Sequence, residues 1–127
     1  MKIFIGEYKH KMDGKGRITI PRKFRDDLGE NPVLTCSFDG ALELYCMADF
    51  AVYSKKLMEL PFDDKENRKR VRKSLSMATD LSFDNLGRIL MPKNLIEFAS
   101  IKKDTVIIGI GNRIEIWDEE SFREYIK

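Results

Sequence analysis

Two stretches of the chain are near copies of each other: DGKGRITIPRKF at residues 13–24 and DNLGRILMPKNL at residues 84–95. The aspartate, one glycine, the arginine, one isoleucine and the proline recur at an offset of 71 residues. Later positions correspond at an offset of 72, since LELY at 42–45 matches IEIW at 114–117. A recurrence of this length indicates that one small unit is present twice.

Each copy predicts the same order of elements. A short strand leads into a glycine-containing turn at 13–16 or 84–87, and alternating residues after the turn predict a half-buried strand. Pro21 or Pro92 ends that strand and starts a short helix, which Gly29 ends in the first copy. A hairpin follows, from 33 to 46 with its turn at residues 39–40, or from 105 to 117 with its turn at 111–112.

An amphipathic helix then closes each unit. Asp49 or Asp118 can cap this helix. The residues that we expect to face the core are Phe50, Tyr53 and Leu57 in the first unit and Phe122, Tyr125 and Ile126 in the second.

A unit of about 50 residues has too little core to be secure alone. We therefore expect one pseudo-twofold domain, with a first repeat at 1–55, a helical connector at 56–75 and a second repeat at 76–127. From Lys65 onwards the spacing predicts a helix with an apolar face (Val71, Leu75, Ala78) and an opposite basic face (Arg68, Lys69, Arg70, Arg72, Lys73). A solvated helix face explains these charges as well as a binding surface does.

Length and composition exclude several protein classes. The 127 residues are 35% charged and 43% hydrophobic, which is typical of a folded domain and not of a disordered tail. No apolar run approaches the roughly 20 residues that span a bilayer. The apolar start turns charged at Glu7, too early for a secretory signal, so we expect a cytoplasmic protein.

The residues that catalysis or metal binding would need are scarce. The one histidine, His10, leaves no ligand cluster for a metal and no Ser-His-Asp arrangement. Cys36 and Cys46 predict two reduced, buried thiols, with Cys36 opposite Glu43 across the first hairpin. A shared-proton pair of Asp13 and Asp84 would need a close approach, and the neighbouring arginines argue against it. We expect no enzyme, no metal, no cofactor and no small-molecule substrate.

The formal net charge of +2 hides an uneven distribution. Residues 1–25 hold eight lysines and arginines against two acids, a balance of +6. Residues 114–127 hold five acids against two basic residues, a balance of −3. We expect this polarity to persist in space, with a basic region that can neutralise phosphates of a nucleic acid.

The doubled turn offers a chemistry for that region. Gly14 and Gly16 would let backbone N–H groups approach a phosphate, and the planar fork of Arg17 can bind guanine O6 and N7 together. Alternatively, Arg17 and Arg88 only pair with aspartates of their own turns and brace them. The arginine can both brace its turn and bind DNA if the aspartate orients it.

The twin Asp-x-x-Gly-Arg turns, the strand and proline after each, and Glu-Ile-Trp-Asp at 115–118 together resemble the MraZ family. That family is related to the AbrB/MazE swapped-hairpin proteins, and the resemblance covers nearly the whole chain. It implies a mainly β fold with flanking helices. Duplicated swapped-hairpin units of the SpoVT-AbrB type would form an intrachain pseudo-dimeric, β-barrel-like core.

The resemblance also implies a function. It implies a sequence-specific transcriptional regulator that binds short promoter repeats of double-stranded DNA upstream of a division and cell-wall gene cluster. Because that cluster usually includes the regulator's own gene, we expect an autoregulatory repressor that is associated with the nucleoid. Ring-like homo-oligomers are also characteristic, and they would raise avidity for repeated sites.

The family motif assigns roles by position. It places DNA binding on Gly14, Lys15, Gly16 and Arg17 in the first turn and on Gly87 and Arg88 in the second, with Asp13 and Asp84 bracing the turns. The motif does not decide whether a further group of residues contacts phosphate: Lys9, His10, Lys11, Arg22 and Lys23. The second turn departs from the motif, since Leu86 stands in the basic position and Asn85 in the place of Gly14. We therefore expect the first turn to dominate.

An antitoxin-like or scaffold protein that binds another protein is the alternative. Swapped-hairpin antitoxins usually carry a long C-terminal tail that wraps the toxin. This sequence ends at Lys127, directly after a predicted helix, so we expect no such tail and favour the DNA-binding interpretation.

Overall fold

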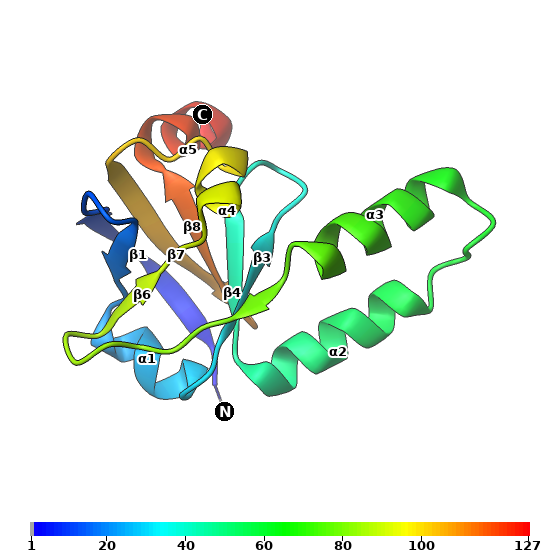
Figure 1. Cartoon of the computed structure of the whole chain (residues 1–127), viewed down its shortest axis with the longest axis horizontal. Coiled ribbons are helices and arrows are strands. Elements are labelled where there is room, and N and C mark those ends of the chain that lie inside the picture. Colours follow the sequence, from blue (N-terminus) through cyan, green and yellow to red (C-terminus); the bar gives the residue numbers. More distant parts are fainter. Residues whose placement is uncertain (1) are drawn as a thin grey trace.

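A six-stranded antiparallel sheet forms the centre of the computed structural model, which describes residues 2–127 (Figure 1). The strands lie in the order β1 (Phe4–Lys11), β7 (Asp104–Gly111), β8 (Ile114–Asp118), β4 (Leu42–Tyr45), β3 (Val33–Cys36) and β5 (Thr79–Asp80). A separate two-stranded sheet pairs β2 (Arg17–Thr19) with β6 (Arg88–Leu90). The expected mainly β fold with flanking helices is confirmed.

The two halves of the chain interlock through these pairings. The first strand of each half pairs with the hairpin of the other half, so that Tyr8 lies opposite Ile107 in β1–β7, and Thr79 lies opposite Leu34 in β5–β3. The hairpins meet through β4 and β8, and the strands after the twin turns meet as β2 and β6. Each half therefore completes the sheet of the other.

The sheet is open, so the expectation of a barrel-like core is wrong in that respect. Among residues 2–127, β1 and β5 are the two edges and do not pair with each other. Strand β5, which follows helix α3 (Lys65–Ser76), has two residues, and both pair with β3, so this edge offers only a short ladder for closing the sheet. A duplicated swapped-hairpin origin stays a prediction.

Five helices flank the sheets in the described residues 2–127. Pro21 and Pro92 are the N-cap residues of α1 (Arg22–Leu28) and α4 (Lys93–Phe98), and Gly29 ends α1 with a φ of 78°. Asp118 caps α5 (Glu119–Ile126) as expected. In α2 (Met47–Met58), however, the N-cap is Cys46, whose sulfur accepts a hydrogen bond from the Asp49 N–H at 3.5 Å. The expected cap at Asp49 is wrong, because Asp49 already lies inside the first turn.

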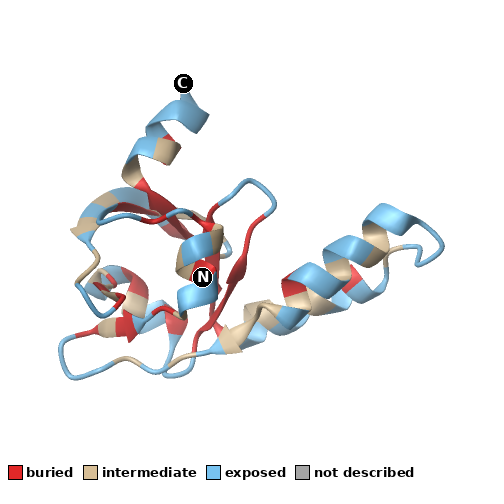
Figure 2. Cartoon of the chain, turned by 45° about the horizontal axis from the view of Figure 1, so that its top comes forward, coloured by how far each residue is buried: buried red, intermediate tan, exposed pale blue. Residues whose placement is uncertain are grey.

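The hydrophobic core lies between the six-stranded sheet and the β2–β6 pair. Ile18 and Ile89 face each other in β2–β6 and are fully buried. Figure 2 shows the buried residues concentrated in the strands and at the inner faces of the helices. Phe122 of α5 is buried, but Tyr125 and Ile126 are more than half exposed, so the expected core positions at the end of α5 are wrong. Phe122 packs on Trp117 from the first turn of that helix, and the ring of Tyr125 contacts Trp117 from the second turn while its outer side stays exposed.

The two hairpins differ by one residue in their loops. Gly111 and Asn112 form the expected two-residue turn, closed by a hydrogen bond from Ile110 N to Arg113 O of 3.0 Å. In the first hairpin Cys36 lies opposite Leu42, so its predicted pairing with Glu43 is wrong. The loop holds three residues because the Ser37 hydroxyl accepts hydrogen bonds from Asp39 N and Ala41 N, which adds one residue to the turn. Both cysteines are free and buried, as predicted.

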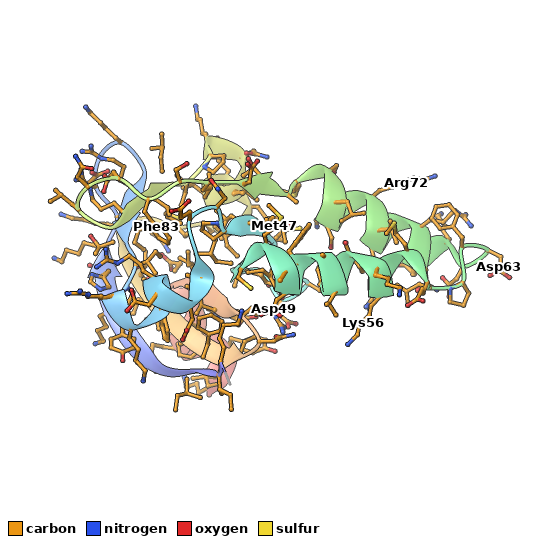
Figure 3. All side chains as sticks on the ribbon, turned by 90° about the horizontal axis from the view of Figure 1, so that it is seen from below. Met47, Asp49, Lys56, Asp63, Arg72 and Phe83 are labelled. Atoms are coloured by element: carbon orange, nitrogen blue, oxygen red, sulfur yellow. The ribbon has the colours of Figure 1, made fainter. Side chains whose placement is uncertain are left out.

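Helices α2 and α3 form an arm that projects from the sheet, with Asp63 at its tip (Figures 1 and 3). Thr35 holds the base of the arm by donating a hydrogen bond to Ser74 O at 2.6 Å. Ser74 is the buried residue of α3, whereas Val71, Leu75 and Ala78 are only half-buried. The basic residues from Lys69 to Lys73 point largely to solvent around Val71. No helix in residues 2–127 is long and apolar enough to cross a membrane.

Candidate nucleic-acid interface

The two Asp-x-x-Gly-Arg turns have the same internal geometry. In the first, Asp13 Oδ1 accepts hydrogen bonds from Lys15 N and Arg17 N at 3.0 and 2.8 Å, while Oδ2 accepts one from Arg17 Nε at 2.7 Å. In the second, Asp84 does the same for Leu86 N, Arg88 N and Arg88 Nε at 2.9, 2.9 and 2.7 Å. Each carboxylate thus closes its turn and fixes the direction of its arginine.

The turns are parts of one continuous site. Ile20 N donates to Gly87 O and Met91 N donates to Gly16 O, so each turn is bonded to the strand that follows the other turn. Arg88 Nη1 also lies 3.8 Å from Asp13 Oδ2, which joins the two ion pairs. Asp13 therefore pairs with both arginines, whereas within residues 2–127 Asp84 pairs with Arg88 alone.

The hydrogen bonds keep both carboxylates charged. Hydrogen bonds from Arg17, led by its backbone N–H, lower the pKa of Asp13 to about 2. The backbone N–H of Arg88 is likewise the largest cause of the lowered pKa of Asp84. Lowered pKa values do not fit two carboxyls that share one proton, which removes the shared-proton pair from consideration.

The geometry leaves part of each arginine free. The Nε atoms of Arg17 and Arg88 are bonded to the aspartates, and Arg88 Nη1 also faces Asp13. The Nη groups of Arg17 and Nη2 of Arg88 are therefore the parts that can meet an external acceptor. The side chains are 32% and 24% exposed. An oriented guanidinium with an open edge is the group that reads guanine or clamps phosphate.

The glycines of the turns have a structural role. Gly16 and Gly87 adopt φ values of 86° and 75°, which L-residues rarely take. Both are buried, and their N–H groups donate to the carbonyls of Asp13 and Asp84. The Gly16 N–H is therefore not available to a phosphate, contrary to our expectation, and the Gly87 N–H is equally occupied. Gly14 and Lys15 are exposed at the tip of the first turn.

The other basic candidates fall into two groups. Arg22 and Lys23 are exposed at the start of α1. On β1, Lys9 pairs with Glu119 at 3.0 Å and Lys11 with Asp104 at 3.8 Å, while the backbone carbonyl of His10 accepts from Thr105. The acidic end of the chain thus lies against the basic start, so the expected separation of charge in space is only partial.

Sequence reasoning missed several lysines beside the first turn. An open hollow of about 990 Å³ lies between this turn and the second half of the chain, and Lys93, Lys102 and Lys103 line it together with Lys15. The adjacent Lys102 and Lys103 were a possible signal, but only the fold brings them beside residues 12–16. Within residues 2–127, no three His, Cys, Asp or Glu side chains gather as metal ligands would.

Comparison with known proteins relates the sequence that forms this site to one family. The profile described as "MraZ protein, putative antitoxin-like" matches residues 3–73 and 75–127. A protein of Clostridium acetobutylicum named "Transcriptional regulator MraZ" is 47% identical over 123 residues, which cover 97% of this chain and 87% of the relative. Proteins of the same name from Clostridium tetani and Halothermothrix orenii are 46% and 47% identical over 97% and 98% of this chain, and 87% of each relative.

Proposed function

This chain belongs to the MraZ family of transcriptional regulators, and we propose that it acts by binding double-stranded DNA through its twin Asp-x-x-Gly-Arg turns. The observation that carries the proposal is the Arg17 guanidinium, which Asp13 holds by Nε at 2.7 Å while its Nη edge stays open. A fixed, open guanidinium loses little entropy when it binds a base edge or a phosphate.

The shape of the site supports a groove-binding mode. The β2–β6 pair is a ribbon of two short strands, and a two-stranded ribbon fits the major groove, which is about 12 Å wide. Because the strands are antiparallel, Arg17 stands opposite Leu90 and Arg88 opposite Thr19, so the arginines come from the two ends of the ribbon. Exposed Lys15, Arg22 and Lys23 are the groups that we assign to phosphates.

Family membership and the resemblance of the motifs support a more detailed proposal. We propose that the sites are short promoter repeats upstream of a division and cell-wall gene cluster that includes the protein's own gene. The protein would act there as an autoregulatory repressor, in the cytoplasm and on the nucleoid. A ring-like homo-oligomer would present several turn pairs to successive repeats and gain avidity from linkage alone.

Substitution of Arg17 tests the assignment. Genomic fragments captured on the wild-type protein supply the operator, and gel-shift titrations compare the variants on it. Arg17→Ala should weaken specific binding by about 1–3 kcal/mol, which is the value of a good arginine–base contact. Lys15→Ala should lower affinity for all sequences alike, and it should reduce the slope of log K against log salt concentration by about 1.

The control is Lys56→Gln, which removes one positive charge from an exposed position on the arm (Figure 3). It should leave binding unchanged. Retention of the operator by Arg17→Ala at wild-type affinity would refute the role of the turn in recognition.

Binding of a protein partner is the second candidate, because the family description includes the word antitoxin-like. Co-purification of a partner at fixed stoichiometry, combined with no DNA binding at low salt, would favour it over the first.

A further inference from the structure

Arg25 of α1 lies against the turn of the other half of the chain. A side-chain carbon at position 87 would overlap Nη1, Cζ and Nε of Arg25, so the guanidinium lies directly against the backbone of Gly87. Gly87 directly precedes Arg88, the arginine of the second turn. Helix α1 thus brings a third arginine to a site where the motif supplies two.

The Arg25 guanidinium has no acceptor within the described chain. Its Nε is buried without a hydrogen-bond partner, and residues 2–127 offer its side chain no carboxylate within 4.0 Å and no hydrogen bond. Arg17 and Arg88 differ in this respect, since an aspartate holds each of them. Nε stays covered by the protein, whereas the Nη groups are not among its buried atoms, so they are the donors that can meet an anion from outside.

The first turn has an equivalent contact, but with an apolar residue in place of the arginine. Position 96 corresponds to position 25, and Ile96 packs on Gly16 as Arg25 packs on Gly87, since a side-chain carbon at position 16 would lie 3.0 Å from Ile96 Cδ1. The first turn therefore combines Lys15 with an apolar Ile96. The second combines an apolar, exposed Leu86 with Arg25. Helix α1 thus gives the second turn a cation that its own position 86 does not supply, whereas the first turn has Lys15 in addition to the lysines of the hollow beside it.

We propose that Arg25 contacts a DNA phosphate beside the second turn, so that both turns meet the duplex and not the first alone. The proposal rests on the proposed function and deepens it. A phosphate is the expected ligand because Arg25 comes from the helix beside the turn, which also carries the exposed Arg22 and Lys23. Helices and turns that flank a reading element supply the backbone contacts that position a protein on DNA.

The test is Arg25→Ile, which gives position 25 the residue of position 96. Binding to a 30-base-pair duplex of mixed sequence is measured by fluorescence anisotropy between about 50 and 200 mM salt. Loss of one phosphate contact should weaken binding and reduce the slope of log K against log salt by about 0.9. Arg25→Gln, which keeps a long polar side chain over Gly87, should give the same change if Arg25→Ile does not fold.

Two further variants sharpen the result. Lys56→Gln removes the same charge on the arm and should leave the slope unchanged. Leu86→Lys in the Arg25→Ile background moves the cation to the position that Lys15 has in the first turn, and should restore the slope.

The outcomes separate this inference from the function on which it rests. If the wild-type protein does not bind duplex DNA, the proposed function fails. If it binds and Arg25→Ile keeps the wild-type slope, whether affinity falls or not, Arg25 only shapes the turn and the inference is overturned.

Discussion

Asp13 fixes three groups of its own turn with two oxygen atoms. Oδ1 accepts two backbone N–H groups and Oδ2 accepts Arg17 Nε, so both oxygens need to be acceptors. Asparagine would place an NH₂ group against one of these donors. The chemistry of this turn therefore depends on a charged carboxylate.

The titration of Asp13 can be predicted from these contacts. Its pKa is lowered to about 2 from an ordinary 3.8, so it contributes stability above pH 3.8 that is lost as the pH falls towards 2. Carbonyl-detected NMR titration should show the Asp13 carboxyl charged throughout the pH range from 7 to 3. Because the backbone N–H of Arg17 is the largest cause, Arg17→Ala should keep the pKa of Asp13 below 3.8. A return to 3.8 in this variant would instead make the guanidinium the dominant cause.

Single residues also show where sequence reasoning ends. Because Asp13 and Arg17 lie in one turn, their pairing was one of the two roles predicted for Arg17, beside binding to guanine. The contact of Arg25 with Gly87 joins two halves of the chain, and no local pattern indicates it. Glu43 and Glu115 stand in alternating strands as surface residues would, yet both are buried. The Tyr45 hydroxyl and Arg113 donate hydrogen bonds to Glu43, and the Trp117 indole N–H donates one to Glu115. Burial nevertheless raises the pKa of Glu43.

At the scale of elements, local signals predicted type and order better than register. Proline and glycine marked the ends of α1 and the start of α4, because these residues restrict or free the backbone wherever they stand. The predicted loop of the first hairpin was one residue too short, since the Ser37 hydroxyl is a side-chain acceptor that turn statistics do not weigh. All four residues of β4 are buried although alternation predicts half, because Tyr53 of α2 stacks on Tyr45 and covers the other face.

The β1–β7 pair depends on one glycine. A side-chain carbon at Gly109 would lie 2.8 Å from Ile5 Cα and closer still to the adjoining peptide of β1. Gly109→Ala should therefore push β1 away and lower the free energy of unfolding by about 1–3 kcal/mol, the range for overpacking. Urea titration followed by Trp117 fluorescence measures the change. Gly14→Ala, where nothing lies within 4 Å, is the matched control for stability. Equal midpoints for both variants would contradict the close approach.

At the scale of the whole molecule, the repeat in the sequence predicted two similar units but not how they combine. Two units side by side and two units that exchange strands carry the same local patterns. The pairings of β1 with β7 and of β5 with β3 decide between these arrangements, because each strand lies in the sheet formed with the other half. The arm of α2 and α3 joins the halves and leaves their shared core on one side (Figure 2).

Interlocked halves should unfold together. Leu44 in β4 and Ile116 in β8 occupy equivalent positions, both are fully buried, and their strands are neighbours. Leu44→Ala and Ile116→Ala should each lower the free energy of unfolding by about 2–5 kcal/mol, the range for such truncations in a core. Trp117, the single tryptophan, reports on the second half. Urea unfolding followed by its fluorescence should give one transition in each variant, shifted by a similar amount, and circular dichroism should give the same midpoints. If the halves were independent, Leu44→Ala in the first half would leave the Trp117 transition at the wild-type midpoint, and the interlocked core would have to be abandoned.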